Sequence, residues 1–158
     1  MTRLLLSLTF LLLSAASASS QNVDQLYEDG KALYDKKKYD QAFPLLMKAA
    51  EQGHKKAEYR VGRCYAKGHG VTESDEVAIQ WYKKSADQGF AKAQYRLGKA
   101  YLKGKGVKTD RAVAEQWLRK AVKNPKGGDK VMEKIREEKM AGDKDAKEIL
   151  KLLKVLIC

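Results

Sequence analysis

A fixed offset of 36 residues between two neighbouring stretches constrains the fold more than any other feature of this sequence. Self-similarity at such a period is typical of repeat architectures, in which each unit buries its apolar face against the next unit. The matching positions are unequally spaced, so chance does not explain them. They are Ala57, Tyr59, Gly62, Tyr65, Gly68, Gly70, Val71, Val77, Ala78, Trp81 and Lys84, which recur at Ala93, Tyr95, Gly98, Tyr101, Gly104, Gly106, Val107, Val113, Ala114, Trp117 and Lys120.

The first half of each unit predicts a helix with one tightly packed face. Tyr59, Gly62 and Tyr65 recur in steps of three, which marks one face of a helix over about 57–67. Gly62 has no side chain on that face, so we expect a neighbouring helix to cross close to it. Gly68 and Gly70 follow, and glycine is the residue that most readily ends a helix in the left-handed conformation.

The second half of each unit predicts a second helix, over about 75–87, with Ala78 and Trp81 packed inward. Ser74 stands where a helix-capping residue belongs, and Asp110 takes the same place one unit later. The unit is therefore a helical hairpin. A shorter variant precedes it, with Gly30 and Ala42 marking its two helices and a loop about four residues shorter.

The C-terminal part departs from the repeat. The stretch 125–128 breaks the chain, and a charged helix is expected from about 129 to 140. A last helix follows with an apolar stripe and a lysine-rich opposite side. We interpret this part as a degenerate capping hairpin, because stacked repeats need a polar outer face at each end; the alternative is a basic helix on an anionic membrane. The stripe consists of Ala146, Ile149, Leu150, Leu153, Leu156 and Ile157.

These residues resemble the Sel1-like repeat, a relative of the tetratricopeptide repeat. The first unit is similar to an ordinary tetratricopeptide repeat. The resemblance implies an all-α solenoid of stacked hairpins wound as a right-handed superhelix, with repeats over 22–53, 54–89 and 90–125 and a cap over 126–158. It also implies an adaptor scaffold for protein interaction, without naming a partner. The residues that carry it are Ala57, Tyr59, Val61, Gly62, Gly68, Gly70, Val71, Ala78, Trp81, Ala86 and Gly89, with their counterparts one unit later.

The N-terminus predicts export. Arg3 precedes an apolar run from Leu4 to Leu13, and small residues follow, which is the order of a cleavable signal peptide. The run is too short for a bilayer span of about 20 residues. We expect a signal peptide over 1–18, cleaved near Ala18, and a periplasmic or secreted protein. An uncleaved N-terminal anchor is the alternative.

The search for chemistry predicts no enzyme, no cofactor and no metal. His54 and His69 are the only histidines, and their spacing fits no metal-ligand motif. His69 stands where Lys105 stands one unit later, so we interpret it as a tolerated residue at a loop tip. Cys64 corresponds to Ala100, which favours a small buried position over a nucleophile. Cys158 is the last residue, and no disulfide between the two cysteines is expected.

One charged feature repeats without an obvious structural need. The chain has 32 Lys and Arg against 20 Asp and Glu, a net charge of +12, which favours acidic partners. Two consecutive units each carry one basic trio, on the face of the first helix that lies away from the tyrosines. First helices line the concave side of a solenoid. A solvated face is the alternative to a binding site. The candidate binding residues are Arg60, Arg63 and Lys67, repeated as Arg96, Lys99 and Lys103.

The basic ladder ends in the first unit, where Glu28, Lys31 and Asp35 take the same places. We therefore predict a monomeric, non-catalytic adaptor or regulator of the cell envelope that holds an acidic protein segment in its groove. Nucleic acid is not expected, because no aromatic residue is interleaved with the basic stripe. An inhibitor or immunity-type protein that neutralises one enzyme is the alternative, and an envelope hydrolase is a third.

Overall fold

The computed structural model describes residues 22–153, which form eight helices and no strand in that range. The first runs over 22–35, and the others follow with short connections. The expected signal peptide, the end of the apolar stripe (Leu156 and Ile157) and Cys158 lie outside the described residues. The bounds are α2 (Tyr39–Glu51), α3 (Lys55–Tyr65), α4 (Asp75–Asp87), α5 (Ala91–Lys103), α6 (Arg111–Val122), α7 (Gly128–Met140) and α8 (Lys144–Leu153).

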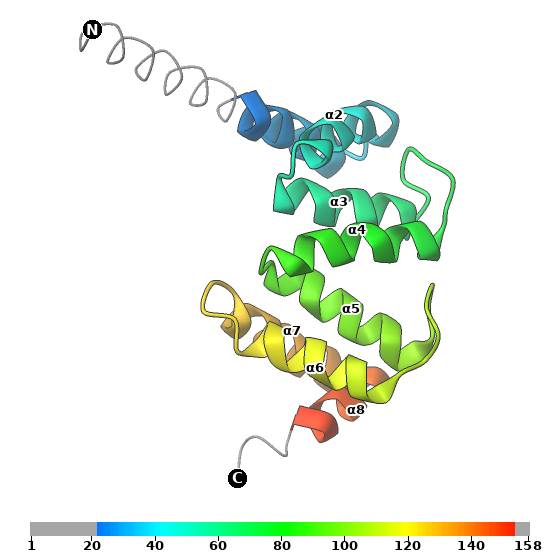
Figure 1. Ribbon diagram of the computed structural model, residues 1–158, viewed down its shortest axis with the longest axis vertical. Helices are drawn as coiled ribbons and strands as arrows, with labels where there is room; N and C mark the ends of the chain where they lie inside the picture. Colours follow the sequence, from blue (N-terminus) through cyan, green and yellow to red (C-terminus); the bar gives the residue numbers. More distant parts are fainter. Residues whose placement is uncertain (1–21, 154–158) are drawn as a thin grey trace, which may run out of the picture.

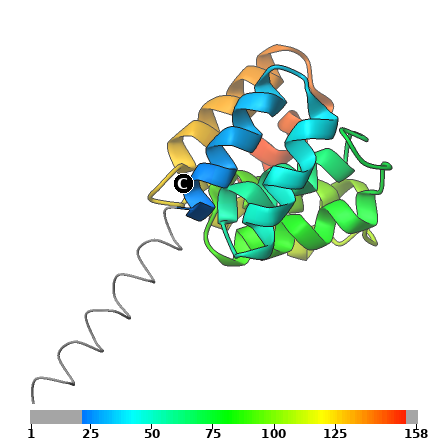
Figure 2. The same ribbon diagram turned by 90° about the horizontal axis from the view of Figure 1, so that it is seen from above.

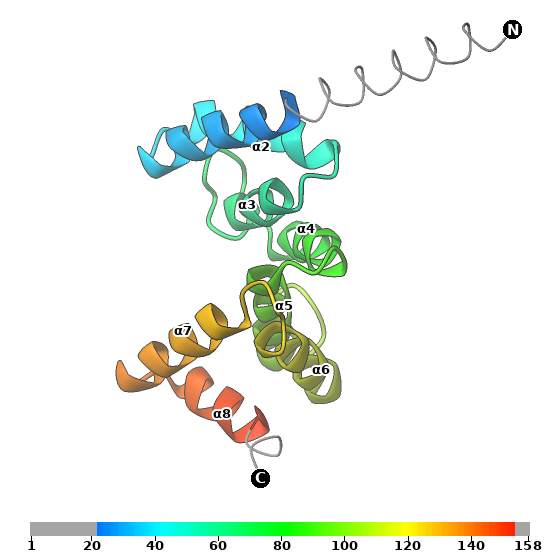
Figure 3. The ribbon, with the colours of Figure 1, turned by 90° about the vertical axis from the view of Figure 1, so that its left-hand side faces the viewer.

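The helices stack as successive hairpins from one end of the molecule to the other (Figure 1). Each of α3, α4, α5 and α6 packs against the helix before it, which is the all-α solenoid expected from the repeat. In a second view α4 and α6 lie on one side of α3 and α5, while α7 projects to the other side (Figure 3). Seen from above, helix 22–35 and α7 lie on the same side of the molecule (Figure 2). No helix within residues 22–153 is long and apolar enough to span a bilayer.

Local capping sets the helix ends. The Ser74 and Asp110 side chains accept hydrogen bonds from the amides of Val77 and Val113, so both predicted caps are confirmed. The side chain of His54 caps α3 in the same way, by accepting from the amide of Ala57. Gly104 ends α5 in the left-handed conformation with a φ of 69°. The helix predicted over 57–67 begins two residues earlier, at Lys55, because His54 caps it, and it ends at Tyr65.

The two matching units pack in the same way. A Cβ on Gly62 would lie 2.7 Å from the Tyr82 ring, and one on Gly98 would lie 2.5 Å from Leu118. The expected close crossing at Gly62 is thus confirmed and recurs one unit later. Tyr59 packs beside Tyr82, and Tyr95 shares a cluster with Leu118, so the two tyrosines have corresponding neighbours.

A polar clamp closes each junction between units. The Gln88 amide donates to the carbonyl of Gly53 at 3.1 Å and to the Glu58 carboxylate at 2.8 Å. The Asn124 amide donates to the carbonyl of Gly89 at 2.8 Å and to the Gln94 side chain at 3.2 Å. All three positions of the clamp are shifted by 36, so the junction is copied along with the hairpin.

The cap is built into the core. α7 and α8 pack on α5 and α6, and Val131 and Ile135 meet Ala146 and Ile149 in one cluster that also holds Tyr95. The part of the apolar stripe that the structure describes is therefore covered by protein. Only the lysine-rich side of α8, including the exposed Lys147 and Lys151, remains outside.

One packing prediction is wrong. His69 is not a free loop tip: its ring stacks on Tyr39 with centroids 3.9 Å apart, and its Nδ1 lies 2.9 Å from the Tyr34 hydroxyl. The glycines on either side fold the loop back onto the first unit, where a Cβ on Gly70 would lie 2.5 Å from the carbonyl oxygen of Tyr39. Trp81 packs inward against the core as expected, but it is only partly buried, and Lys84 Nζ lies 4.1 Å from the centroid of its ring.

Candidate protein-binding groove

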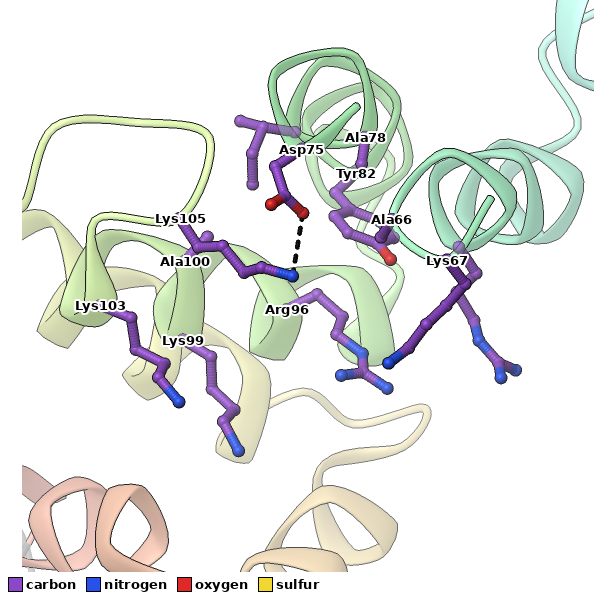
Figure 4. Close-up of a pocket in the computed structure, with 12 residues that line it drawn as sticks. Ala66, Lys67, Asp75, Ala78, Tyr82, Arg96, Lys99, Ala100, Lys103 and Lys105 are labelled. Carbon is purple, nitrogen blue, oxygen red and sulfur yellow. Dashed lines mark ion pairs between the residues drawn. The ribbon is translucent and has the colours of Figure 1, made fainter. Parts of the chain in front are cut away.

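Five of the six candidate residues line one cavity of about 240 Å³ between α3 and α5. Lys67, Arg96, Lys99 and Lys103 extend to the same side of these helices (Figure 4). They do so because residues three, four and seven positions apart share a helix face. At the rim, Lys105 forms an ion pair of 3.1 Å with Asp75.

The sixth candidate, Arg60, lies in an adjoining cavity. That cavity, of about 400 Å³, is bounded by helix 22–35, α3, α5 and the start of α7. A third cavity of about 250 Å³ lies between the other two: it shares Arg63 and Arg96 with the first and Lys92 and Lys130 with the second. We call the three together the basic groove, and the third alone the central compartment.

The basic groove contains cations that sequence reasoning missed. Lys56 and Lys92 stand one helical turn before Arg60 and Arg96, and they too are separated by 36 positions. The 36-residue offset would therefore have been enough to predict both lysines as part of the basic stripe. α7 contributes Lys130, together with Lys134 in the central compartment. The repeat pattern could not predict Lys130 and Lys134, because the cap departs from that pattern.

Acidic residues of the first unit neutralise one end of the groove. The Arg60 guanidinium lies 3.4 Å from the carboxylate of Asp35 and above the Tyr34 ring. Glu28 pairs with Lys31 at 3.1 Å. The mixed charge expected for the first unit is therefore present, and Arg60 is matched by a carboxylate of this chain; its role in binding a partner stays a prediction.

The cap neutralises the opposite end. Lys99 Nζ lies 3.3 Å from Glu138, 3.7 Å from Asp143 and 3.8 Å from Asp145. Lys103 Nζ lies 2.5 Å from Asp145. We call Glu138, Asp143 and Asp145 the acidic turn, since they stand around the connection from α7 to α8. Lys99 and Lys103 are thus matched by carboxylates of this chain, because α7 returns across α5 and brings the acidic turn to it; their role in binding a partner stays a prediction.

Two carboxylates of the acidic turn, Glu138 and Asp143, have a lowered pKa and are held in the charged form. Partial burial by itself would raise the pKa of Glu138, but hydrogen bonds from Tyr95 and Lys134 and the charge of Lys99 outweigh it and lower that pKa. The Tyr95 hydroxyl donates to Glu138 at 2.5 Å. The pKa of Asp143 is lowered mainly by the amide of Ala146, which donates to its carboxylate at 3.0 Å.

The middle of the groove has no such neutralisation. Within residues 22–153, Arg63, Lys67, Lys92, Arg96 and Lys130 take part in no ion pair. No acidic side chain lines the central compartment, whose other walls are Tyr59, Tyr95 and Val131. Arg63 and Arg96 are both partly buried. Guanidinium groups in that setting favour carboxylate or phosphate ligands, which they bind through two parallel hydrogen bonds.

The aromatic residues lie closer to these cations than the sequence pattern indicated. Tyr59 and Tyr95 were placed on the packing face, yet both also line the central compartment. Tyr95 is only 2% exposed, so its ring offers no surface for stacking. Tyr59 is partly buried against Phe90 and Tyr82.

The other reactive side chains have structural surroundings. Cys64 is 1% exposed, and burial raises the pKa of its thiol to about 11, so the nucleophilic thiolate is scarce at neutral pH. Among residues 22–153 no group of three or more His, Cys, Asp or Glu side chains is placed to hold a metal ion. The absence of catalysis stays a prediction.

Comparison with known families places the repeats. The Sel1 repeat matches three consecutive stretches, 25–54, 55–90 and 91–125, which cover most of the chain. The chain belongs to the Sel1 repeat family. Sel1 repeats generally form scaffolds for protein–protein interaction. The resemblance drawn from the residues alone is thereby confirmed.

Two solved structures carry the same fold. A Sel1 repeat protein from Oxalobacter formigenes is 38% identical, with a TM-score of 0.63 over 81% of this chain. The protein c5321, described as a protective antigen of uropathogenic Escherichia coli strains with an SLR fold, is 31% identical, with a TM-score of 0.66 over 87% of this chain. The matched region spans 53% of the first protein and 31% of the second, so both relatives are longer than this Sel1 repeat chain.

Proposed function

We propose that this protein is an exported adaptor or regulator that binds an acidic segment of another protein in the basic groove. One observation carries the proposal: cations of the same repeated stripe are matched by carboxylates at both ends of the groove and by none in its middle. A partly buried charge without a partner costs stability, and a protein that binds an anion there recovers that cost in the complex.

The cap gives an internal example of the chemistry. Three carboxylates of the acidic turn meet Lys99 and Lys103 on the groove side of α5. A partner segment rich in Asp and Glu would make the same contacts with the neighbouring cations. Export rests on the N-terminal pattern of Arg3, the apolar run and Ala18, and it places the partner in the periplasm or outside the cell.

The test is direct binding of a defined acidic peptide. A fluorescein-labelled peptide of alternating Asp and Glu is titrated with the purified protein at low salt, and anisotropy is recorded. We expect saturable binding that weakens as salt screens the charges, and loss of binding in the double variant Arg63→Glu/Arg96→Glu with unchanged helical circular dichroism. The double variant Arg136→Glu/Lys139→Glu reverses two exposed charges on α7 that do not line the groove, and it serves as the control with the same change of net charge.

Two results would contradict the proposal. Equal binding by the Arg63→Glu/Arg96→Glu variant and the wild type would place the peptide elsewhere. Saturable binding of polyphosphate under the same conditions, with no binding of the peptide, would point to a non-protein polyanion as the ligand.

A further inference from the structure

The acidic turn occupies part of the surface that the repeat pattern marks for a partner. Lys99 and Lys103 are the repeat counterparts of Arg63 and Lys67, yet they contact Glu138, Asp143 and Asp145. The Glu138 carboxylate is fixed further by the Tyr95 hydroxyl and by Lys134 at 3.2 Å. This end of the groove is therefore closed by the chain itself.

The central compartment is the opposite case. Its lining contains five cations and no acid, and only Lys134 among the five is matched by a carboxylate. The compartment holds about 250 Å³, enough for more than one carboxylate group. One bound carboxylate would leave most of this charge unmatched, whereas two adjacent acidic side chains would balance about half of it.

The groove has a direction and a length. Its cavities follow α5 from Lys92 to Lys103, alongside α3 and the turn after it. A helix rises 1.5 Å per residue, so eleven steps give a groove of roughly 17 Å. An extended chain advances about 3.3 Å per residue, so about five residues fit along it.

We propose that the acidic partner segment is a short extended stretch in which two acidic residues, separated by one residue and so on the same face of the chain, enter the central compartment. Arg63 and Arg96 bind their carboxylates, and Lys92 and Lys130 close over them. The acidic turn repels a third acidic residue from the Lys99–Lys103 end, so it fixes how far the segment reaches. This inference rests on the proposed function and adds the register of the segment, meaning which of its residues lie in which part of the groove.

Two labelled peptides, Gly-Asp-Gly-Glu-Gly-Gly and Asp-Glu-Asp-Glu-Asp-Glu, probe the central compartment and the Lys99–Lys103 end of the groove by anisotropy. We expect Arg96→Gln and Lys130→Gln to weaken binding of the first peptide about tenfold each, the loss of one charged hydrogen bond. The paired variant Lys103→Gln/Asp145→Asn removes one cation and its own carboxylate together. We expect this paired variant to bind the first peptide with an affinity within about twofold of wild type, a much smaller change than the roughly tenfold loss expected when one charged hydrogen bond is removed.

A gain of affinity provides the sharper arm, because misfolding does not produce one. Asp143→Asn/Asp145→Asn removes two charges while asparagine still caps α8 at position 143. The second peptide should then bind several-fold more tightly, while the first is unaffected. If neither peptide responds to this variant, the acidic turn does not set the register.

The two proposals fail in different ways. If Arg63→Glu/Arg96→Glu abolishes binding but Lys103→Gln/Asp145→Asn weakens the first peptide as much as Arg96→Gln does, the groove binds acidic segments without the proposed register. If neither peptide binds the wild-type protein at all, the proposed function fails with it.

Discussion

Lys99 on α5 and Glu138 on α7 form an ion pair of 3.3 Å across 39 positions of sequence. It ties the third repeat to the cap at the point where the groove ends. Both side chains are largely shielded, with 16% and 23% of their surface exposed. Contacts of this kind contribute more than a pair on the open surface.

Removing the charge at Glu138 should loosen the cap. We expect Glu138→Gln to lower the free energy of unfolding by about 1–2 kcal/mol, because the hydrogen bonds from Lys99 and Lys134 lose their charged acceptor. Urea denaturation of this variant, Lys99→Met and the double variant measures the coupling between the two residues. Strictly additive effects would show that the pair contributes nothing.

Acid should weaken the same contact. The pKa of Glu138 lies below its ordinary value of 4.5 in the folded protein, so its contribution is complete above that value and is lost as the pH falls through the folded pKa. The difference in unfolding free energy between wild type and Glu138→Gln should therefore shrink as the pH drops from 7 to 3. A difference that stays constant over this range would count against the assignment.

His69 should make the first junction sensitive to mild acid. Burial, and then the charges of Arg63 and Lys67, lower the pKa of His69 below its ordinary 6.5. The unfolded chain thus takes up the proton first, so the contribution is complete above pH 6.5 and declines as the pH falls toward the folded pKa. Thermal unfolding at pH 8 and pH 5.5 should show a larger loss for wild type than for His69→Phe, which keeps a ring to stack on Tyr39. Equal losses would exclude His69 as the cause.

The glycine crossings should tolerate no side chain. A methyl group at Gly62 meets the Tyr82 ring at 2.7 Å, and one at Gly98 meets Leu118 at 2.5 Å. Gly62→Ala and Gly98→Ala should each destabilise the protein by about 1–3 kcal/mol, despite the higher helix propensity of alanine. Chemical denaturation checks the sign. A stabilised variant would mean that the helices separate at little cost.

Cys64 should be unreactive in the folded protein. Its thiol is buried, with a pKa of about 11, and Arg60 and Arg63 offset the burial only in part. In a Cys158→Ser background, a thiol reagent should label Cys64 only as fast as the protein unfolds, and urea should accelerate labelling. Rapid labelling in native buffer would show that the site opens locally.

The sequence predicted most of the fold because its information is periodic. Tyr59, Gly62 and Trp81 recur at a fixed offset, and Ser74 and Asp110 signal helix starts through local hydrogen bonds. The contacts of His69 could not be predicted from the repeat. Its counterpart is Lys105, and its partners Tyr34 and Tyr39 lie in a unit with a shorter loop.

The candidate groove was predicted in part. Arg63, Lys67 and Arg96 could be found from the repeat, and so could Lys56 and Lys92 had the stripe been followed one turn further back. Lys130 and the acidic turn could not, because no residue in the repeat specifies where a divergent hairpin will pack.

The sequence by itself determined the helical hairpins, their order and the side of α3 and α5 on which the cations stand, since helix periodicity is a local property of the chain. Only the tertiary structure decided which of those charges are matched. The pairing of Arg60 with Asp35, and of Lys99 and Lys103 with the acidic turn, depends on the angle at which the first and last hairpins return across the groove. For the last hairpin that angle is set by the packing of Tyr95, Leu118, Val131 and Ile135, a contact between distant segments.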